Sequence, residues 1–434
     1  MSQPTSFLLS DVRCFGGDHW ANLKPITLLV GENSTGKSTF LGCYSVLHQM
    51  LSRSLVPGDS ANFNKEPFSM GSFRNIVRSR RGRDGSIDEF SLGFRLAPVR
   101  KSGMRPFRLR ITFAEEGSEP TVTSVHYRFD SESFVDVGRS RSGGSVLRVP
   151  GSEAELDIGI GDWVFIMDFL FQPDLAKYFG KSNAVLSIAA YLSRFFSLPR
   201  SDRRAWLPTL HDLVPIAPLR SKPKRTYDPV RETAMPDGEH IPMLMMRLDR
   251  TDKSGWNLLH DDLVDFGQES GLFSDIKVRR HGKQMSDPFQ LQVKVRSGSY
   301  ANLVDVGYGV SQSLPILVDV RSERRSVFLL QQPEVHLHPR AQAGLAELFV
   351  ESFRKNRNRF LIETHSDYII DRIRILVRKQ TIRPADVSVL YFEPVGNSVK
   401  IHNIGMDRDG NLTGTPVGYR DFFVRETDRL LGFE

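Results

Sequence analysis

The sequence contains very little cysteine and no long apolar run. Cys14 and Cys43 are the only cysteines among 434 residues, too few for a disulfide framework, and their spacing is not that of a zinc site. The most apolar window, 163–171, includes Asp168 and is far shorter than the roughly 20 residues needed to cross a bilayer. The first residues also lack the basic and apolar parts of a secretion signal. We therefore expect a cytoplasmic protein without a membrane anchor.

The chain also lacks an excess of glycine or proline, an internal repeat, and a heptad pattern long enough for a coiled-coil arm. These absences exclude collagen-like and low-complexity proteins. The composition is that of a globular protein, with 40% hydrophobic and 25% charged residues, and the length allows two to four domains of about 100–200 residues. The net charge of +7 is compatible with a nucleic-acid partner without requiring one.

The hydrophobic pattern of the first 150 residues predicts an α/β unit followed by an antiparallel sheet. Residues 7–13 and 26–30 have the composition of strands, and residues 38–50 have apolar positions at helical spacing. Short alternating runs between residues 90 and 149 are separated by Gly, Ser, Pro and Asp. Such runs are typical of an antiparallel β meander.

After residue 150 the sequence pattern changes twice. Residues 161–199 have helical spacing, which predicts a mainly helical insertion, whereas the Pro-rich and basic segment Pro215–Tyr227 is typical of a loop. Strand-like runs return at 276–280 and 289–295. From Val304 onward helices and apolar strands alternate, which predicts a parallel sheet. The expected helices are 311–320, 340–353 and 367–378, and the expected strands are 327–330 and 360–363.

The segment Gly31–Ser38, GENSTGKS, fits the phosphate-loop pattern G-x-x-x-x-G-K-[ST]. It lies between a buried-type strand and a helix, which is the context that this motif requires. Small residues there let backbone N–H groups surround phosphates, Lys37 adds charge near the β- and γ-phosphates, and Ser38 can bind Mg²⁺. The sequence therefore predicts an ATP site with Mg²⁺. The residues expected to contact the nucleotide are Gly31, Asn33, Ser34, Thr35, Gly36, Lys37, Ser38 and Thr39.

A second strand should supply carboxylates for Mg²⁺ and for the attacking water. The apolar run 327–330 has the right form and is followed by Gln331, Gln332, Pro333 and Glu334. It lies 294 residues after Lys37, too far for one compact nucleotide fold. We therefore expect the nucleotide domain to be split in sequence, with parts at 1–150 and 301–434 and an inserted helical or mixed region at 151–300.

Four segments in order carry a resemblance to a known family: VGENSTGKST, VGYGVSQSLPIL, QQPEVHLHPRAQ and IETHSDYIIDRI. The chain resembles ABC-type ATPases of the chromosome-maintenance, RecF and OLD-like group. It is similar in particular to stand-alone bacterial "AAA family" ATPases, many of them in DNA-repair or anti-phage defence operons. The likeness covers residues 1–75, residues 300–434 and the loop PIAPLRSKPKRTY. It implies an ABC-type P-loop α/β fold with an antiparallel β subdomain and a helical insertion.

In that family two nucleotide domains close head to tail around two ATP molecules. The resemblance implies a homodimer in which Ser311, preceded by Gly307 and Gly309, contacts the ATP of the other subunit at the start of a helix. It also implies that His365 senses the γ-phosphate held by its own subunit. Taken alone these features are weaker signals, because a GYG sequence is often a plain turn and a single histidine is often structural.

The sequence departs from the family at two positions. Gln331 stands where the family has the Mg²⁺-associated carboxylate, and Gln332 stands where it has the catalytic Glu. An amide is not a general base at neutral pH, so three interpretations remain open. The chain is a natural switch with slow or no hydrolysis, or it carries Glu-to-Gln changes that trap ATP, or another carboxylate substitutes. Glu363 is our preferred substitute and Glu334 is the alternative. No lid-loop glutamine is assigned.

Several other side chains allow two interpretations. His336 and His338 have the spacing of a metal pair, but alternate positions after a strand usually face core and solvent in turn. Phe15 and Trp20 have the character of either adenine-stacking or core aromatics. The basic stretches 78–83 and 277–283, and the loop Pro215–Tyr227, are candidate phosphate contacts or solvated surface.

We therefore expect an ATP-binding, slowly hydrolysing dimeric switch or sensor in bacterial defence or DNA maintenance. The 69 residues after His365 contain no acidic cluster of the nuclease kind found in OLD proteins, so any nuclease or toxin is expected on a separate effector protein. The alternative is a non-hydrolysing ATP-binding scaffold. A transporter subunit fits less well because its motifs lie closer together, and the resemblance disfavours kinases and GTPases.

Overall fold

A computed structural model describes the chain over residues 3–52, 61–79, 87–96, 106–129, 131–139, 145–156, 210–228, 233–419 and 428–432. These residues belong to two compact units that are interleaved along the sequence. The first unit comprises Met1–Leu23, Glu32–His211 and Phe392–Ile401, and the second comprises Lys24–Gly31, Asp212–Tyr391 and His402–Glu434. The helix expected over 161–199 lies outside the described residues. The expected boundaries at 150 and 300 stay predictions.

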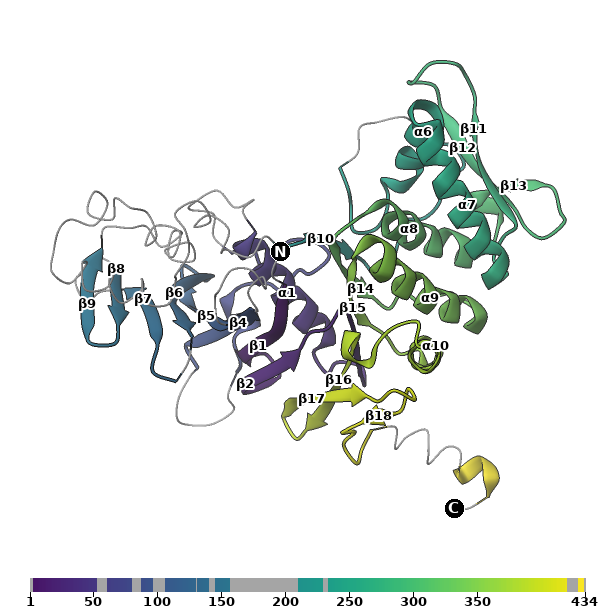
Figure 1. The fold of residues 1–434 in the computed structure, drawn as a ribbon. Helices are drawn as coiled ribbons and strands as arrows, with labels where there is room; N and C mark the ends of the chain where they lie inside the picture. Colours follow the sequence, from purple (N-terminus) through teal and green to yellow (C-terminus); the bar gives the residue numbers. More distant parts are fainter. Residues whose placement is uncertain are drawn as a thin grey trace, which may run out of the picture. The chain divides into compact units, whose positions relative to one another are not determined.

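The first unit contains an eight-stranded antiparallel sheet with the order β2-β1-β4-β5-β6-β7-β8-β9 (Figure 1). The predicted meander is therefore confirmed, and it is extended by two N-terminal strands. The strands are β1 (Pro4–Val12), β2 (Phe15–Asn22), β4 (Glu89–Leu96), β5 (Phe107–Glu116), β6 (Glu119–Arg128), β7 (Phe134–Arg139), β8 (Ser145–Val149) and β9 (Ser152–Leu156). Strands β2, β7 and β9 were not predicted, because polar residues interrupt their alternation.

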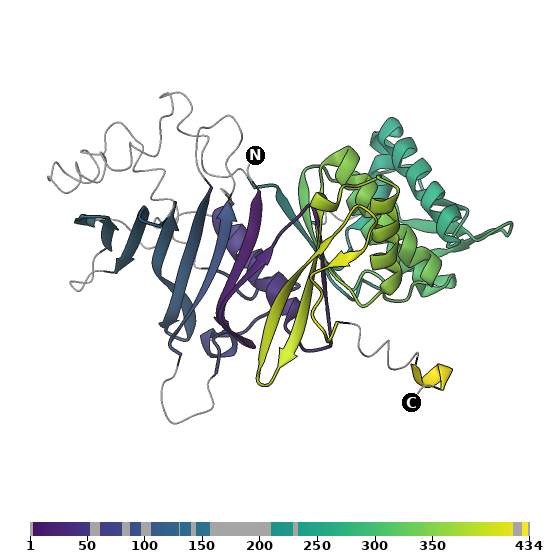
Figure 2. The ribbon, with the colours of Figure 1, turned by 60° about the horizontal axis from the view of Figure 1, so that its bottom comes forward.

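Helix α1 (Lys37–Leu51) packs against one face of this sheet (Figure 2). The ring of Phe7 on β1 lies edge-on to Phe40 and Tyr44 of α1, with centroids 4.9 and 5.6 Å apart, and Tyr44 in turn meets Phe94 of β4 at 5.2 Å. Such edge-to-face pairs stabilise the contact beyond simple burial. The helix that follows the phosphate loop is thus fixed to the sheet by aromatic packing. A short helix, α2 (Phe73–Ile76), also belongs to this unit.

The second unit contains a seven-stranded sheet with the order β10-β14-β15-β3-β16-β17-β18. Strands β10, β14, β15 and β3 pair in parallel, which confirms the expected parallel sheet. The strands are β3 (Ile26–Gly31), β10 (Asp212–Ile216), β14 (Ser326–Gln331), β15 (Arg359–Glu363), β16 (Val387–Val395), β17 (Ser398–Met406) and β18 (Leu412–Thr413). The expectation of a loop from Pro215 onward is wrong at its start, since Pro215 is in β10. That strand is at the sheet edge, where proline is tolerated.

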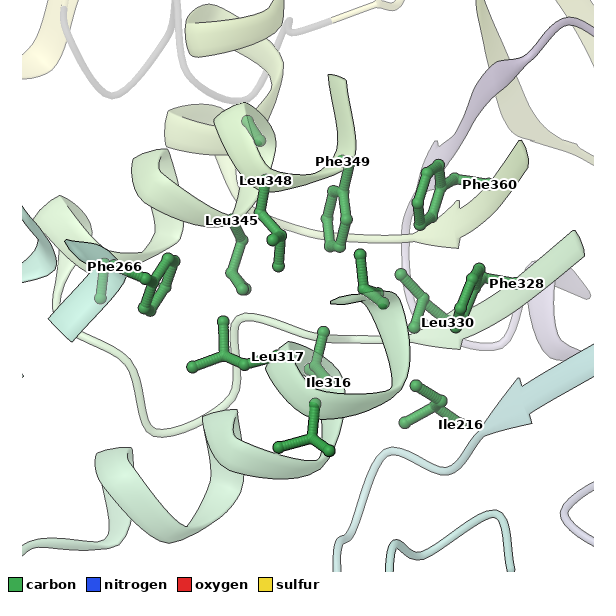
Figure 3. Packing of buried hydrophobic residues seen from close by; sticks show 14 of the residues in the cluster. Ile216, Phe266, Ile316, Leu317, Phe328, Leu330, Leu345, Leu348, Phe349 and Phe360 are labelled. Carbon is green, nitrogen blue, oxygen red and sulfur yellow. The ribbon is translucent and has the colours of Figure 1, made fainter. Parts of the chain in front are cut away.

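Helices of the second unit pack together with the parallel strands around one apolar core. Phe328, Leu330 and Phe360 from the strands meet residues of three helices there, including Ile316, Leu345 and Phe349 (Figure 3). The helices are α6 (Ile241–Thr251), α7 (Lys253–Ser270), α8 (Tyr308–Ser322), α9 (Pro339–Asn356) and α10 (Asp367–Arg378), with 3₁₀ turns η2 (Leu303–Asp305) and η3 (Pro384–Asp386). Helices α6 and α7 were not predicted, whereas α8, α9 and α10 were.

A small antiparallel sheet of three strands completes the second unit. It contains β11 (Asp275–Arg280), β12 (Phe289–Lys294) and β13 (Tyr300–Asn302) in that order. One face is apolar and buried, because Ile276, Leu291 and Val293 are fully covered. The residues that alternate with them along the strands form the opposite, polar face.

The first unit also buries a histidine that has no hydrogen-bond partner among the described residues. His48 on α1 is 1% exposed, and neither ring nitrogen is satisfied. Burial, together with the nearby His211, lowers the pKa of His48 to about 3. Because the folded protein resists protonating this ring, the free energy of unfolding should fall as pH drops from about 6.5 towards 3, by up to about 1.4 kcal/mol per pH unit.

We expect the substitution His48→Leu to flatten that acid-side loss of stability and to leave stability above pH 7 equal or higher. Thermal or denaturant unfolding between pH 4 and 8 measures this. The matched control is His281→Leu, which changes an exposed histidine. If both variants lose stability with acid as steeply as the original protein, His48 is not the group responsible.

Candidate phosphate-binding site

The phosphate loop follows directly after the last residue of β3, Gly31. Lys37 begins α1 and is 3% exposed, and its Nζ donates to the carbonyl of Glu32 at 2.6 Å. The hydroxyl of Thr35 donates to the same carbonyl at 2.8 Å. Asn33, Ser34 and Ser38 are exposed, whereas Thr35, Lys37 and Thr39 are buried. The side chain of Lys37 is thus bound to the backbone of its own loop, whereas Asn33, Ser34 and Ser38 are at the surface.

Backbone conformation explains the glycine at the start of α1. Gly36 is the N-cap in the left-handed region, with φ of 85°, and it has no side chain that could accept from the first N–H groups of the helix. A Cβ atom there would lie 2.6 Å from Sγ of Cys14 and 2.7 Å from the ring of Phe15. These N–H groups at a helix N-terminus are suited to an anion such as a phosphate.

The aromatic and polar neighbours of the loop are structural. Phe15 is fully buried and packs edge-on to Phe392, which fits the core interpretation rather than adenine stacking. Trp20 lies under the guanidinium of Arg108 at 5.3 Å. The Arg13 side chain donates to the hydroxyl of Thr39 at 3.0 Å, so this predicted nucleotide contact already has a protein partner.

Three parallel strands bring the other predicted residues into one row. Gln331, the last residue of β14, pairs with Glu363, the last residue of β15, and Glu363 pairs with Leu29 of β3. Paired positions of neighbouring strands project to the same face, so Gln331 and Glu363 are neighbours there. Gln332 is in the left-handed region with φ of 44°, and its N–H donates to the carbonyl of Glu363 at 2.8 Å. The strand pairing thus connects the double glutamine to the strand that leads into the phosphate loop.

The side chain of Gln331 is a candidate ligand for the predicted Mg²⁺. It is 8% exposed, and its Oε1 has no hydrogen-bond partner among the described residues. A buried oxygen without a partner is costly unless something binds it, and amide oxygens are acceptable ligands of hard cations. Gln331 therefore fits the role of a Mg²⁺ ligand, but with an amide where a carboxylate binds more strongly.

Glu334 connects this loop to His365. Its Oε1 accepts a hydrogen bond from the backbone N–H of His365 at 2.7 Å, while its Oε2 is buried without a hydrogen-bond partner in the described chain. Burial raises the pKa of Glu334, although the N–H of His365 and the charge of Arg220 counteract the rise. His365 itself is exposed, just beyond the end of β15. Glu334 therefore holds the backbone beside the predicted γ-phosphate sensor.

The predicted signature residues lie at the start of α8, but the helix begins earlier than expected. It starts at Tyr308 with Gly307 as N-cap, so the expectation that Ser311 begins it is wrong by three residues. Ser311 is 6% exposed, and its hydroxyl donates to the carbonyl of Tyr308 at 3.0 Å. A Cβ atom on Gly309 would lie 3.1 Å from the carbonyl of His336. Glycine is therefore needed at 309 for packing, whatever else it contacts.

Arg220 belongs to the basic loop Pro215–Tyr227, which was predicted to be a solvated connection or a phosphate contact, but it is a buried charged group at the centre of this region. It is 5% exposed, and burial lowers its pKa to about 10, which leaves it positively charged at neutral pH. Its side chain donates to the carbonyls of Gln312 and Pro333, both at 3.0 Å, and to that of Pro218 at 2.6 Å. The only sequence signal was its place in the loop that shares the family resemblance.

The structure places the two histidines after β14 in contacts within the protein. His338 is the N-cap of α9, where its Nδ1 accepts from the N–H of Arg340 at 3.3 Å, and the ring of His336 packs near Tyr308. Across the described ranges, no group of three or more His, Cys, Asp or Glu side chains is arranged to hold a metal ion.

Basic residues of the second unit gather near its three-stranded sheet. Lys277, Arg279 and Lys294 occupy the polar face, at positions paired with Gln292, Gln290 and Asp275. The loop that carries Lys222 lies beside them, because Tyr227 and Phe289 exchange backbone hydrogen bonds of 2.9 and 3.1 Å. In contrast, Arg78 of the stretch 78–83 donates to the carbonyl of Cys14 at 2.9 Å and is structural. Residues 80–83 lie outside the described chain.

One family model matches part of the chain. Residues 188–371 match the family described as "AAA domain, putative AbiEii toxin, Type IV TA system". No curated protein matches the chain. The predicted fold class is confirmed, since the phosphate loop joins a parallel sheet to a helix packed on an antiparallel sheet. None of the described helices is long and apolar enough to cross a membrane.

Several solved structures resemble the chain. An Smc head bound to the C-winged helix domain of ScpA is 10% identical, with 93% of this chain and 98% of that chain covered and a TM-score of 0.44. An Smc head domain with an extended coiled coil, bound to the C-terminal domain of ScpA derived from Pyrococcus furiosus, is 10% identical, with 99% and 100% covered and a TM-score of 0.45. The SMC head domain from Thermotoga maritima is 11% identical, with 92% and 98% covered and a TM-score of 0.38.

We expect Gly36→Ala to weaken ATP binding strongly and to destabilise the first unit by more than about 2 kcal/mol. Alanine at positive φ costs roughly 1–2 kcal/mol, and the new Cβ adds a close contact to that cost. Thermal unfolding and titration with a fluorescent ATP analogue measure both effects. The matched control is Gly17→Ala, also at positive φ (71°) but with no atom within 4 Å of the new Cβ. Equal effects of the two substitutions would contradict the packing argument.

Proposed function

We propose that the chain, which resembles the chromosome-maintenance-like group of ABC-type ATPases, binds Mg²⁺ and ATP at residues 31–39 and uses the bound nucleotide to close a homodimer. The observation that carries the proposal is the row of adjacent strand ends. The phosphate loop follows β3, and Glu363 and Gln331 end the two strands next to it in order. Ligands of open parallel sheets bind at the carboxyl ends of the strands, where these residues lie.

The two glutamines determine how the bound ATP is used. Mg²⁺, held by Ser38 and Gln331, would neutralise charge on the phosphates. Gln332 can orient water by hydrogen bonds but cannot take its proton at neutral pH. The chain is therefore a slow ATPase in which the closed, ATP-bound state is long-lived. Glu363, buried beside Gln331, is the carboxylate that supports residual turnover.

Dimer closure places the start of α8 against the nucleotide of the partner subunit. Gly307 and Tyr308 are exposed at this helix end, and Gly309 allows close backbone approach. Ser311 is one turn inside the helix and is buried in the single chain, so its contact with ATP requires a rearrangement of this first turn. His365 contacts the γ-phosphate of its own subunit. Higher oligomers built from such dimers are compatible with this arrangement.

The switch controls a separate effector, such as a nuclease or toxin, in bacterial defence or DNA maintenance. The support is the family resemblance and the match to a family whose description refers to a toxin–antitoxin system. The alternative is a scaffold that binds ATP without hydrolysing it, which the double glutamine favours. A change of Glu to Gln that traps ATP would leave the same chemistry.

We expect the protein with Gln332→Glu to hydrolyse ATP at least about 10²-fold faster than the original, because a positioned general base contributes roughly 10²–10⁴-fold. Adding Lys37→Ala should abolish the gain, since Lys37 supplies charge at the β- and γ-phosphates. Steady-state phosphate release with Mg²⁺ measures both.

If the original protein already hydrolyses ATP as fast as the Gln332→Glu variant, the slow-switch proposal is wrong. Glu363→Gln then identifies the base, because loss of turnover in that variant assigns the role to Glu363. If Lys37→Ala leaves turnover unchanged, the hydrolysis does not come from this site.

A second candidate activity is contact with nucleic acid, and the basic face of the three-stranded sheet favours it. Lys222, Lys277, Arg279 and Lys294 have no ion pair with any described residue, although Lys277 lies 3.5 Å from the centre of the Tyr300 ring. Lys222 and Arg279 are exposed, and Lys277 and Lys294 are half-buried. Cations without an ion pair at a protein surface attract phosphate groups. We propose that this face contacts the nucleic-acid backbone.

We expect the triple variant Lys277→Gln, Arg279→Gln and Lys294→Gln to bind a 30-bp DNA about 10-fold or more weakly and to lower the salt slope by about 2–3, since each phosphate contact adds about 0.9. Fluorescence anisotropy at several salt concentrations measures this. The control variant changes three exposed cations elsewhere in the unit, Arg324, Arg354 and Lys379, to Gln. Equal loss in both variants would show a general charge effect rather than a site.

A further inference from the structure

We propose that Arg220 is a positioning residue that couples the two ATP sites of the dimer, by tying the start of α8 to the loop that holds His365. This inference rests on the proposed function, in which α8 contacts one ATP and His365 contacts the other. It assigns a role to a buried arginine that lies outside the phosphate loop and the strand ends.

The burial of Arg220 shows that its position is fixed by several partners at once. A guanidinium that is only 5% exposed is stable only when its donors are satisfied and its charge is compensated. Three carbonyls, of Pro218, Gln312 and Pro333, accept its N–H groups, and Glu334 supplies the nearby negative charge. These partners come from its own loop, from α8 and from the loop after β14. Movement of any one of them would break hydrogen bonds of a buried charge.

On the helix side, Arg220 is bound to the residue next to Ser311. Its Nε donates to the carbonyl of Gln312, and the Gln312 amide side chain bonds to the backbone N–H and carbonyl of Arg220 at 3.2 and 3.4 Å. Pro315 lies inside the same helix and has no N–H, so the helical hydrogen bond to the carbonyl of Ser311 is missing. The first turn of α8 is therefore less firmly attached to the rest of the helix, and Arg220 contacts the chain at that point.

On the loop side, the connection continues to His365 in two steps. Arg220 holds the carbonyl of Pro333, and the next residue, Glu334, accepts the N–H of His365 at 2.7 Å. Because Pro333 and Glu334 share a peptide unit, a shift of the carbonyl reorients the group that positions His365. A continuous set of hydrogen bonds thus runs from Gln312 to His365 within one subunit.

In the proposed dimer these two ends belong to different ATP sites. Closure of the start of α8 onto the partner's nucleotide would be transmitted through Arg220 to the histidine at the subunit's own nucleotide. To hold three carbonyls at once, the side chain at position 220 must be a forked donor. Lysine keeps the charge but cannot supply such a fork. Loss of the fork should therefore remove cooperativity between the sites while ATP binding to each site remains.

The experiment compares the full-length protein with Arg220→Lys in ATP-dependent dimerisation, followed by sedimentation velocity, and in the binding isotherm of a fluorescent ATP analogue with Mg²⁺. We expect a Hill coefficient approaching about 2 for the original protein and near 1 for Arg220→Lys, with dimerisation at fixed ATP weakened about 5- to 150-fold. A purely structural role would lower the unfolding temperature without changing the Hill coefficient.

Two further variants make the outcome decisive. Arg321→Lys changes a largely buried arginine on α8 itself, which is bound to Glu351 at 2.7 Å, and should keep the cooperativity of the original protein. Gln312→Met removes the hydrogen bonds of the Gln312 amide to Arg220 and should reduce cooperativity. If Arg220→Lys does not fold, the result for Gln312→Met alone tests the coupling role. Unchanged cooperativity in a folded Arg220→Lys or Gln312→Met protein would overturn the coupling role. If the original protein binds ATP but never dimerises, the proposed function itself is wrong.

Discussion

The parallel pairing of β3, β15 and β14 is the constraint on which the rest of the candidate site depends. Because these strands run in the same direction, their carboxyl ends lie side by side, although β3 is far from the other two strands in sequence. Gln331 and Glu363 are neighbours only through this pairing. The core between the strands and helices α7, α8 and α9 holds the pairing in place (Figure 3).

Buried polar groups show where the second unit depends on precise positioning. Each side-chain nitrogen of Arg220 donates to a carbonyl, whereas Oε1 of Gln331 and Oε2 of Glu334 have no hydrogen-bond partner among the described residues. Unsatisfied buried oxygens are costly, and these two come from neighbouring positions beside the end of β14. The charge of Arg220 lies near one of these groups and counteracts the rise that burial causes in the pKa of Glu334.

The fold and the phosphate loop were largely predictable, and the errors have local physical reasons. The strand before Gly31 and the helix after Gly36 were predicted because their signals are contained in a few adjacent residues. Pro215 was assigned to a loop because proline disfavours strands, but its strand is at the edge of the sheet and needs no inner N–H. The start of α8 was placed at Ser311 because two glycines precede it, yet Gly309 is helical and packs against the carbonyl of His336.

The sequence by itself determined the local chemistry: a loop of small residues with Lys37, and an amide at 332 where a base is expected. Such features depend on backbone conformation and residue type over a short span. The tertiary structure alone decided that Arg220 contacts Gln312 and Pro333, which lie 92 and 113 positions away, and that Glu334 holds the N–H of His365. No local pattern encodes these contacts, because each exists only when sheet pairing and helix packing bring separate segments together.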